Sequence, residues 1–132
     1  DAWFRIFTIQ IAQNYSLRQK STFVYRFDWS SPLSPVPDAA IHAAEIPYIF
    51  GNLENPFLTT NTSPGEVDEN ISQLMMDCWT QFAEYGKPSH EKCPAWEPYT
   101  ASQENILVFD KDLHIETIAK GRLRSLWDEI LK

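Results

Sequence analysis

Glycine is scarce in this chain of 132 residues, which has only four glycines, far apart at positions 51, 65, 86 and 121. A nucleophile elbow of the G-x-S-x-G type needs two glycines around a serine, and an oxyanion hole of the glycine-run type needs several in a row. Phosphate-binding loops and dinucleotide fingerprints also need clustered glycines. The sequence therefore contains none of these four motifs.

Cysteine is nearly as rare, with Cys78 and Cys93 as the only two. Two cysteines are too few for a disulfide framework, and no C-x-x-C spacing indicates a metal or redox site. We expect no metal and no cofactor. Cys78 falls on the apolar face of a predicted helix, which favours a buried free thiol, although a single bridge to Cys93 remains geometrically possible.

Positively charged residues are also few. The chain has 11 Lys and Arg but 18 Asp and Glu, which gives a net charge of −7. This balance argues against nucleic acid and against an anionic membrane as partners. No segment has the long uncharged apolar run that a membrane-spanning helix needs. Sequons of the Asn-x-Ser type at Asn14, Asn61 and Asn70 arise often by chance and do not decide the compartment.

Hydrophobic periodicity predicts the main elements. Residues 2–14 place Trp3, Phe4, Phe7, Ile11 and Ala12 at helical spacing, which predicts a helix ending near Tyr15–Ser16. Residues 22–29 alternate aromatic residues with other types and are typical of a strand. A stiff loop with three prolines follows at 30–38, and then a short apolar stretch at 39–52 contains one histidine.

The clearest helix follows Ser63-Pro64-Gly65-Glu66, which has the pattern of a capping box with proline at the first helical position. Its apolar residues keep to steps of three and four until Gly86 closes it. They are Val67, Ile71, Leu74, Met75, Cys78, Trp79, Phe82 and Tyr85. Residues 105–110 and 113–118 are strand candidates, and Leu123, Leu126, Trp127, Ile130 and Leu131 predict a final amphipathic helix.

This set of elements does not suit a free-standing domain. One strand and a short hairpin cannot make an ordinary sheet of about five or six strands, and a strand with an aromatic face needs neighbours on both edges. We therefore expect an α/β chain whose sheet is incomplete without residues from outside it.

Three stretches resemble the C-terminal region of type-B carboxylesterases, the family of para-nitrobenzyl esterases and cholinesterases. The first is V-Y-R-F at 24–27, in the predicted strand. The second is H-x-x-E-x-P-Y-x-F-G at 42–51, and the third is W-x-x-F-A-x-x-G-x-P at 79–88. Weaker matches are Asp1, Phe4, W-E-P-Y at 96–99 and Trp127, so that the resemblance covers the whole chain in order.

The sequence departs from the family pattern at three positions. Ala39 stands where a glycine usually precedes the histidine, so the backbone there cannot need a positive φ without strain. Phe7 occupies a common proline position, and Pro98 comes one residue late after Trp96. The last two are consistent with packing variation.

The resemblance implies that residues 1–132 are the C-terminal part of a single α/β-hydrolase domain whose nucleophile-bearing N-terminal part is absent. It implies that His42 is the general base of a Ser-His-Asp/Glu triad, which in this fold ends with the histidine in a late loop. Taken by itself, a lone histidine in an Ala- and Ile-rich segment is more often a satisfied core residue.

The remaining candidates have smaller roles. By resemblance Glu45 is a buried carboxylate near the histidine and not the triad acid, because one turn of chain leaves too cramped a geometry. Tyr48 and Phe50 are expected to help form the acyl or alcohol pocket. His90 and His114 are expected to be structural or exposed. The aromatic residues of the two helices are expected to belong to the core; they are Trp79, Phe82, Tyr85 and Trp127.

The function implied is that of a serine carboxylesterase, which hydrolyses small-molecule carboxylic esters through an acyl-serine intermediate. This chain alone is expected to be inactive, with the N-terminal part of the same hydrolase as its partner, and to self-associate through exposed strand edges if isolated. An alternative from another class is an esterase-like binding or adhesion protein that has lost catalysis. The presence of both His42 and Glu45 favours the enzyme.

Overall fold

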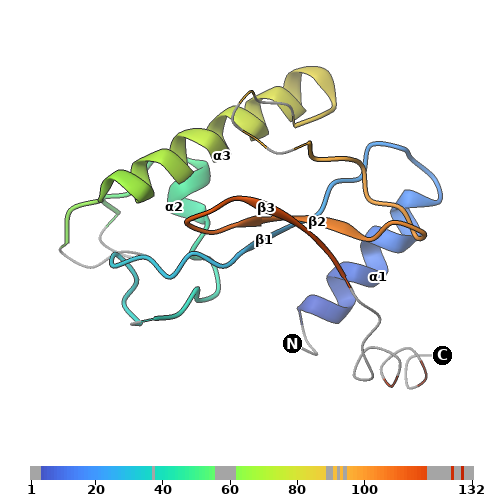
Figure 1. The fold of residues 1–132 in the computed structure, drawn as a ribbon, viewed down its shortest axis with the longest axis horizontal. Helices are drawn as coiled ribbons and strands as arrows, with labels where there is room; N and C mark the ends of the chain where they lie inside the picture. The colour runs from blue at the N-terminus through green and yellow to red at the C-terminus, as the bar shows by residue number, and fades with distance from the viewer. Residues whose placement is uncertain are drawn as a thin grey trace. The chain divides into compact units, whose positions relative to one another are not determined.

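The structure is a computed structural model of residues 1–132 that describes residues 4–36, 38–55, 62–88, 91, 93, 95–118, 126 and 129. Figure 1 shows the elements, which in chain order are α1 (Arg5–Ser16), β1 (Tyr25–Phe27), α2 (Ile46–Ile49), α3 (Glu66–Tyr85), β2 (Asn105–Phe109) and β3 (His114–Thr117). The chain forms two compact units. The first is Asp1–Val24, Glu97–Ile106 and Glu116–Lys132, and the second is Tyr25–Trp96 and Leu107–Ile115.

In the first unit, α1 confirms the predicted helix, but the face that it buries is not the aromatic one. Its buried residues are Ile6, Ile9 and Ala12, and the Gln13 amide donates a hydrogen bond of 2.9 Å to Glu104. The opposite face leaves large apolar side chains exposed. These are Phe4, Phe7, Ile11 and Tyr15.

The sheet has the order β1-β2-β3, and β1 runs parallel to β2 with Tyr25 opposite Leu107 and Phe27 opposite Phe109. Both predicted C-terminal strands are confirmed. The strand predicted over 22–29 is shorter, because the backbone N–H groups of Asp28 and Trp29 both donate to the one carbonyl of Phe109, at 2.8 and 3.1 Å. Two donors on one acceptor end the regular ladder at this point.

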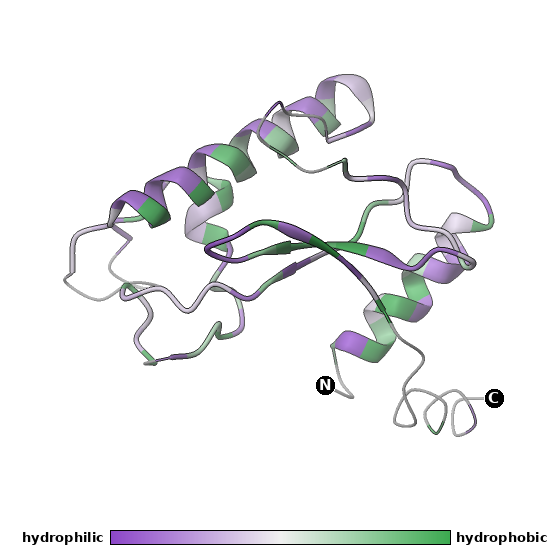
Figure 2. Cartoon of the chain, in the orientation of Figure 1, coloured by the Kyte–Doolittle hydropathy of each residue, from purple (hydrophilic) through white to green (hydrophobic). Residues whose placement is uncertain are grey.

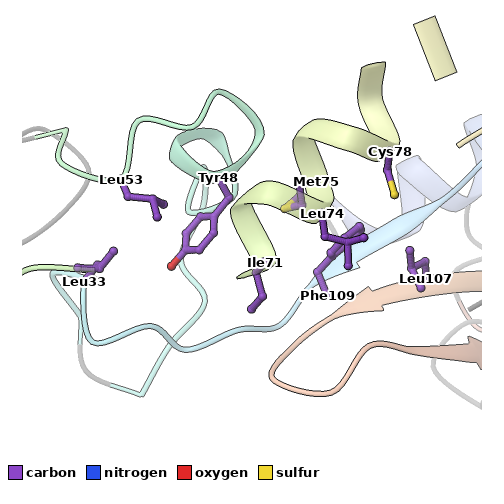
Figure 3. Packing of buried hydrophobic residues seen from close by; sticks show 9 residues of the cluster. All are labelled: Leu33, Tyr48, Leu53, Ile71, Leu74, Met75, Cys78, Leu107 and Phe109. Carbon is purple, nitrogen blue, oxygen red and sulfur yellow. The ribbon is translucent and has the colours of Figure 1, made fainter. Parts of the chain in front are cut away.

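The core of the second unit lies between α3 and the strands (Figure 3). In Figure 3 the apolar side chains of α3 point toward those of β2, and Tyr48 of α2 lies beside Ile71. Figure 2 shows β2 as mainly hydrophobic and α3 as a mixture of hydrophobic and hydrophilic residues, as expected for a buried strand and an amphipathic helix. The cluster consists of Leu33, Tyr48, Leu53, Ile71, Leu74, Met75, Cys78, Leu107 and Phe109.

The start of α3 differs from the prediction. The helix begins at Glu66 with Gly65 as its N-cap, two residues later than Ser63 and Pro64 suggested. Gly65 has no side chain to accept an N–H group of the first turn, so only the reciprocal half of a capping box is present, in which the carboxylate of Asp68 accepts the Gly65 N–H at 3.0 Å. The predicted end is confirmed, because Gly86 has φ 73° and its N–H bonds to Phe82 O at 2.8 Å.

The predicted apolar face of α3 is buried over its first three turns only. Met75 and Cys78 are fully buried, but Phe82 is 44% and Tyr85 61% exposed, so these two are not core residues. A helix of 20 residues is about 30 Å long. A strand of five residues spans about 17 Å, so the last turns of α3 extend beyond the strands that it covers.

Some predictions concern residues that lie outside the described part of the chain. These residues are His90, Trp127 and most of the predicted final helix, of which only Leu126 and Glu129 are described. Within the described part of the chain, no helix is long and apolar enough to cross a bilayer. Cys78 is a buried free thiol, as predicted, and Cys93 is a partly buried one.

Candidate functional site

His42 lies on the loop between β1 and α2, with its side chain exposed. The loop is built from tight turns, in which Ser34 N bonds to Ser31 O at 2.9 Å and Ala44 N to Ile41 O at 3.1 Å. The second of these turns encloses His42. Prolines and short polar residues favour such turns over helix or strand, and they present the histidine on an ordered backbone.

The residue after His42 has a strained backbone. Ala43 has φ 67° and Asp38 has φ 55°, in the left-handed region that costs a residue with a Cβ about 1–2 kcal/mol. Ala39 does not share this conformation, so alanine suits the position where the family usually has glycine. Strain of this kind collects at functional sites, and here it directly adjoins the candidate base.

The carboxylate of Asp68 holds both ends of the His42 loop. Its Oδ1 accepts hydrogen bonds from Trp29 Nε1 at 2.8 Å, Ser31 Oγ at 2.5 Å and Tyr48 Oη at 2.6 Å. Trp29 and Ser31 precede the histidine, and Tyr48 follows it. A residue of α3 therefore fixes where the loop leaves the sheet and where it enters α2.

Hydrogen bonds determine the protonation states of Asp68 and of the donors around it, which together form the Asp68 cluster. Burial raises the pKa of Asp68, but the bonds from Ser31, Trp29 and Tyr48 outweigh that effect and hold the pKa below its usual range. Burial, together with the bond to Asp68, raises the pKa of the Tyr48 hydroxyl. Asp68 is therefore a carboxylate and Tyr48 a neutral donor at neutral pH.

Glu45 ends the loop at the N-cap of α2. Its carbonyl accepts the N–H groups of Tyr48 and Ile49, both at 3.0 Å, which starts the helix. Its side chain is partly buried, and its charge adds to the effect of burial in raising the pKa of Tyr25. Glu45 is thus near enough to Tyr25 of β1 for its charge to act on that hydroxyl.

The two candidate pocket residues differ in environment. Tyr48 is 3% exposed and belongs to the core, with its ring 5.0 Å from that of Phe27. Phe50 is 76% exposed just after α2. The cavity behind the loop, between Leu33 and Tyr48, has a volume of about 10 Å³, room for one water and far below the several hundred Å³ of an ester-sized pocket.

His114 is the other candidate histidine among the described residues. His114 is exposed on β3, and its Nδ1–H donates to Asp112 O at 2.9 Å. Within the described residues, no group of three or more His, Cys, Asp or Glu side chains is arranged to hold a metal ion.

The model of the carboxylesterase family matches residues 1–127. The chain belongs to the carboxylesterase family. It is 33% identical over 105 residues to a para-nitrobenzyl esterase of Bacillus subtilis (strain 168), covering 77% of this chain and 20% of that protein. It is 34% identical over 111 residues to a bile salt-activated lipase of Bos taurus, covering 80% of this chain and 18% of that protein.

Among solved structures, an esterase of the anaerobe Clostridium hathewayi that can hydrolyse aliphatic aromatic polyesters superposes with a TM-score of 0.80 at 25% identity. The match covers 98% of this chain and 25% of that one. This carboxylesterase chain thus has the fold of part of an α/β-hydrolase, and it spans about a fifth to a quarter of the length of the relatives described.

Sequence reasoning missed Asp68. An acidic residue in the first turn is a common local sign of a helix start, and from it the bond between the Asp68 carboxylate and the Gly65 N–H could have been predicted. The three side-chain donors are 20, 37 and 39 residues away in sequence. No local pattern indicates that these segments meet.

Proposed function

We propose that this carboxylesterase chain is the C-terminal part of one hydrolase domain and supplies the triad histidine of a serine carboxylesterase. The observation that carries the proposal is the position of His42. It is the exposed histidine of an anchored loop after a strand, in a family member whose sequence there reads H-x-x-E-x-P-Y-x-F-G.

The chemistry needs an imidazole that is neutral before reaction. His42 accepts the proton of a serine hydroxyl as the oxygen attacks the ester carbonyl, and it donates that proton to the departing alcohol as the acyl-serine forms. In the second half it takes a proton from water, which attacks the acyl-serine, and returns it to the serine oxygen. The serine and the triad acid belong to the N-terminal part of the domain.

The remaining site residues have supporting roles in this proposal. Glu45 is a carboxylate beside the loop and not the triad acid. Phe50 presents an exposed ring to the acyl or alcohol group. Tyr48 is buried behind this end of the loop, where its bond to Asp68 holds α2 in place. The substrate is a small carboxylic ester, and no cofactor takes part.

The partner of this chain in the proposal is the N-terminal part of the same domain. Within the described residues β1 and β3 are the outer strands of the sheet, and an unpaired strand edge accepts another strand. The N-terminal part pairs with such an edge, and if this chain is isolated, two copies associate there instead. The chain alone is inactive, because the members of a triad act as a unit.

Labelling with a fluorophosphonate probe tests the proposal. The whole protein and this chain are treated side by side, together with whole protein that carries His42→Ala. We expect label on the whole protein only, and its loss in the variant. A folded whole protein that takes no label would instead favour the esterase-like binding protein, in which His42 has no catalytic task.

A further inference from the structure

Two thiols that ester hydrolysis does not use lie side by side in the second unit. The Sγ atoms of Cys78 and Cys93 are 3.5 Å apart. Cys78 is on the buried face of α3 with no exposed surface, and Cys93, which follows that helix in the chain, is partly exposed. A disulfide bond holds its sulfur atoms about 2.0 Å apart, so a small closing movement brings these two within bonding distance.

Aromatic packing holds the two cysteines together independently of their own contact. Trp79 follows Cys78, and Trp96 lies three residues after Cys93; their ring centroids are 6.3 Å apart. Both rings also pack on Phe109 of β2, at 6.0 and 6.2 Å. Trp96 is therefore held against Trp79 of α3, and the two cysteines meet in the packed state of the unit.

We propose that Cys78 and Cys93 form a disulfide bond that joins α3 to the chain that leads to Trp96, and that the two free thiols are its reduced form. The oxidant is a small disulfide such as oxidised glutathione. The bond closes residues 78–93 into a loop, which lowers the conformational entropy of the unfolded chain and so stabilises the folded one. The bond stabilises the packing of Trp96 on α3 and leaves the His42 loop unaltered.

The order of the two steps follows from exposure and charge. The hydrogen bond from the Cys78 thiol lowers the pKa of Cys93, whereas the same contact and burial raise the pKa of Cys78. The Cys93 thiolate attacks oxidised glutathione and releases one glutathione thiolate. Cys78 then attacks the Cys93 sulfur, its proton passes to solvent, and the second glutathione leaves. Two protein thiols are oxidised, and one oxidised glutathione becomes two reduced ones.

Peptide mapping of the whole protein tests this pairing. The protein is equilibrated with oxidised glutathione or with dithiothreitol, denatured, alkylated and digested without reduction. We expect the Cys78 and Cys93 peptides to be joined after oxidation only. Two alkylated cysteines after oxidation, or Cys93 joined to a different cysteine, would overturn the proposal.

Single variants give a matched control. In Cys78→Ala, Cys93 should stop at the mixed disulfide with glutathione, and in Cys93→Ser the buried Cys78 should remain a thiol. Oxidation should raise the midpoint of thermal unfolding by several degrees in the wild type and leave both variants unshifted. An equal rise in Cys93→Ser would place the effect elsewhere and contradict the proposal.

Discussion

The hydroxyl of Tyr48 donates a hydrogen bond of 2.6 Å to Oδ1 of Asp68, with both side chains buried. The bond joins the short helix that follows the His42 loop to the first turn of α3. Ser72, one turn further along α3, reinforces the contact, because its hydroxyl donates to the Tyr48 carbonyl at 2.9 Å. The entry of the loop into α2 is thus held by both the side chain and the backbone of one tyrosine.

Removing the Tyr48 hydroxyl should destabilise the protein without removing the ring from the core. Tyr48→Phe is expected to lower the free energy of unfolding by about 1.5–3 kcal/mol, the usual loss for a buried hydrogen bond to a charged acceptor. Urea unfolding measures the change. Tyr15→Phe, at a 55% exposed position of α1, is the control and should change stability by less than about 0.5 kcal/mol.

Replacing Asp68 with asparagine should remove the negative charge and one of the two acceptor atoms. Oδ1 can still accept a bond, but the amide NH₂ at the position of Oδ2 meets the Gly65 N–H, which is itself a donor. Asp68→Asn is therefore expected to cost about 2–4 kcal/mol. The matched variant Asp77→Asn, on the partly exposed side of α3, should cost much less, and equal losses in urea unfolding would argue against the role of Asp68.

The same carboxylate predicts how stability depends on pH. The pKa of Asp68 is lower in the folded chain than in the unfolded chain, where an aspartate titrates near pH 4. Its contribution is therefore complete above about pH 4 and is lost as the pH falls through the folded pKa. Wild type should lose more stability than Asp68→Asn between about pH 5 and about pH 2; parallel pH profiles would contradict the assignment.

Much of this fold follows from local pattern, and the exceptions have identifiable causes. The period of apolar residues located α1, α3, β2 and β3, and Gly86 marked the end of α3. Periodicity failed to say which face of α1 is buried, because apolar residues occur on both faces and the choice depends on neighbours distant in sequence. The start of α3 was misplaced because Ser63 and Pro64 match a capping pattern, whereas the helix begins two residues later, where Asp68 accepts the Gly65 N–H.

Of the candidate site, only the sequence motif around His42 could be predicted. The histidine and its flanking residues stand in a short continuous stretch, so the family resemblance carries them. The Asp68 cluster, in contrast, joins side chains from three separate segments, and it becomes visible only in three dimensions.

Backbone strain beside His42 predicts a substitution that increases stability, unlike the substitutions at Tyr48 and Asp68. Ala43→Gly removes the Cβ that makes φ 67° unfavourable, which outweighs the extra entropy of glycine in the unfolded chain, so we expect a gain of up to about 1 kcal/mol. Ala44→Gly gains no such relief and should lose about 0.5–1 kcal/mol. Chemical unfolding of the two variants distinguishes them, and a loss at Ala43 would refute the strain.

Truncations along α3 should follow the observed burial and not the sequence periodicity. Met75→Ala opens a cavity in the core and should cost about 2–5 kcal/mol. Phe82→Ala, at a 44% exposed position, should cost clearly less although phenylalanine is the larger side chain. Thermal and urea unfolding of the two variants compare them directly, and a larger loss at Phe82 would mean that another part of the protein covers this end of α3.

The central claim is that His42 is the general base of a serine carboxylesterase, and the turnover of the whole protein on a nitrophenyl ester tests it most directly. We predict that His42→Ala lowers kcat by a factor of about 10⁴ to 10⁶ with the protein still folded. His114→Ala, which removes another exposed histidine, should change kcat by less than about twofold. An unchanged kcat in His42→Ala would contradict the account.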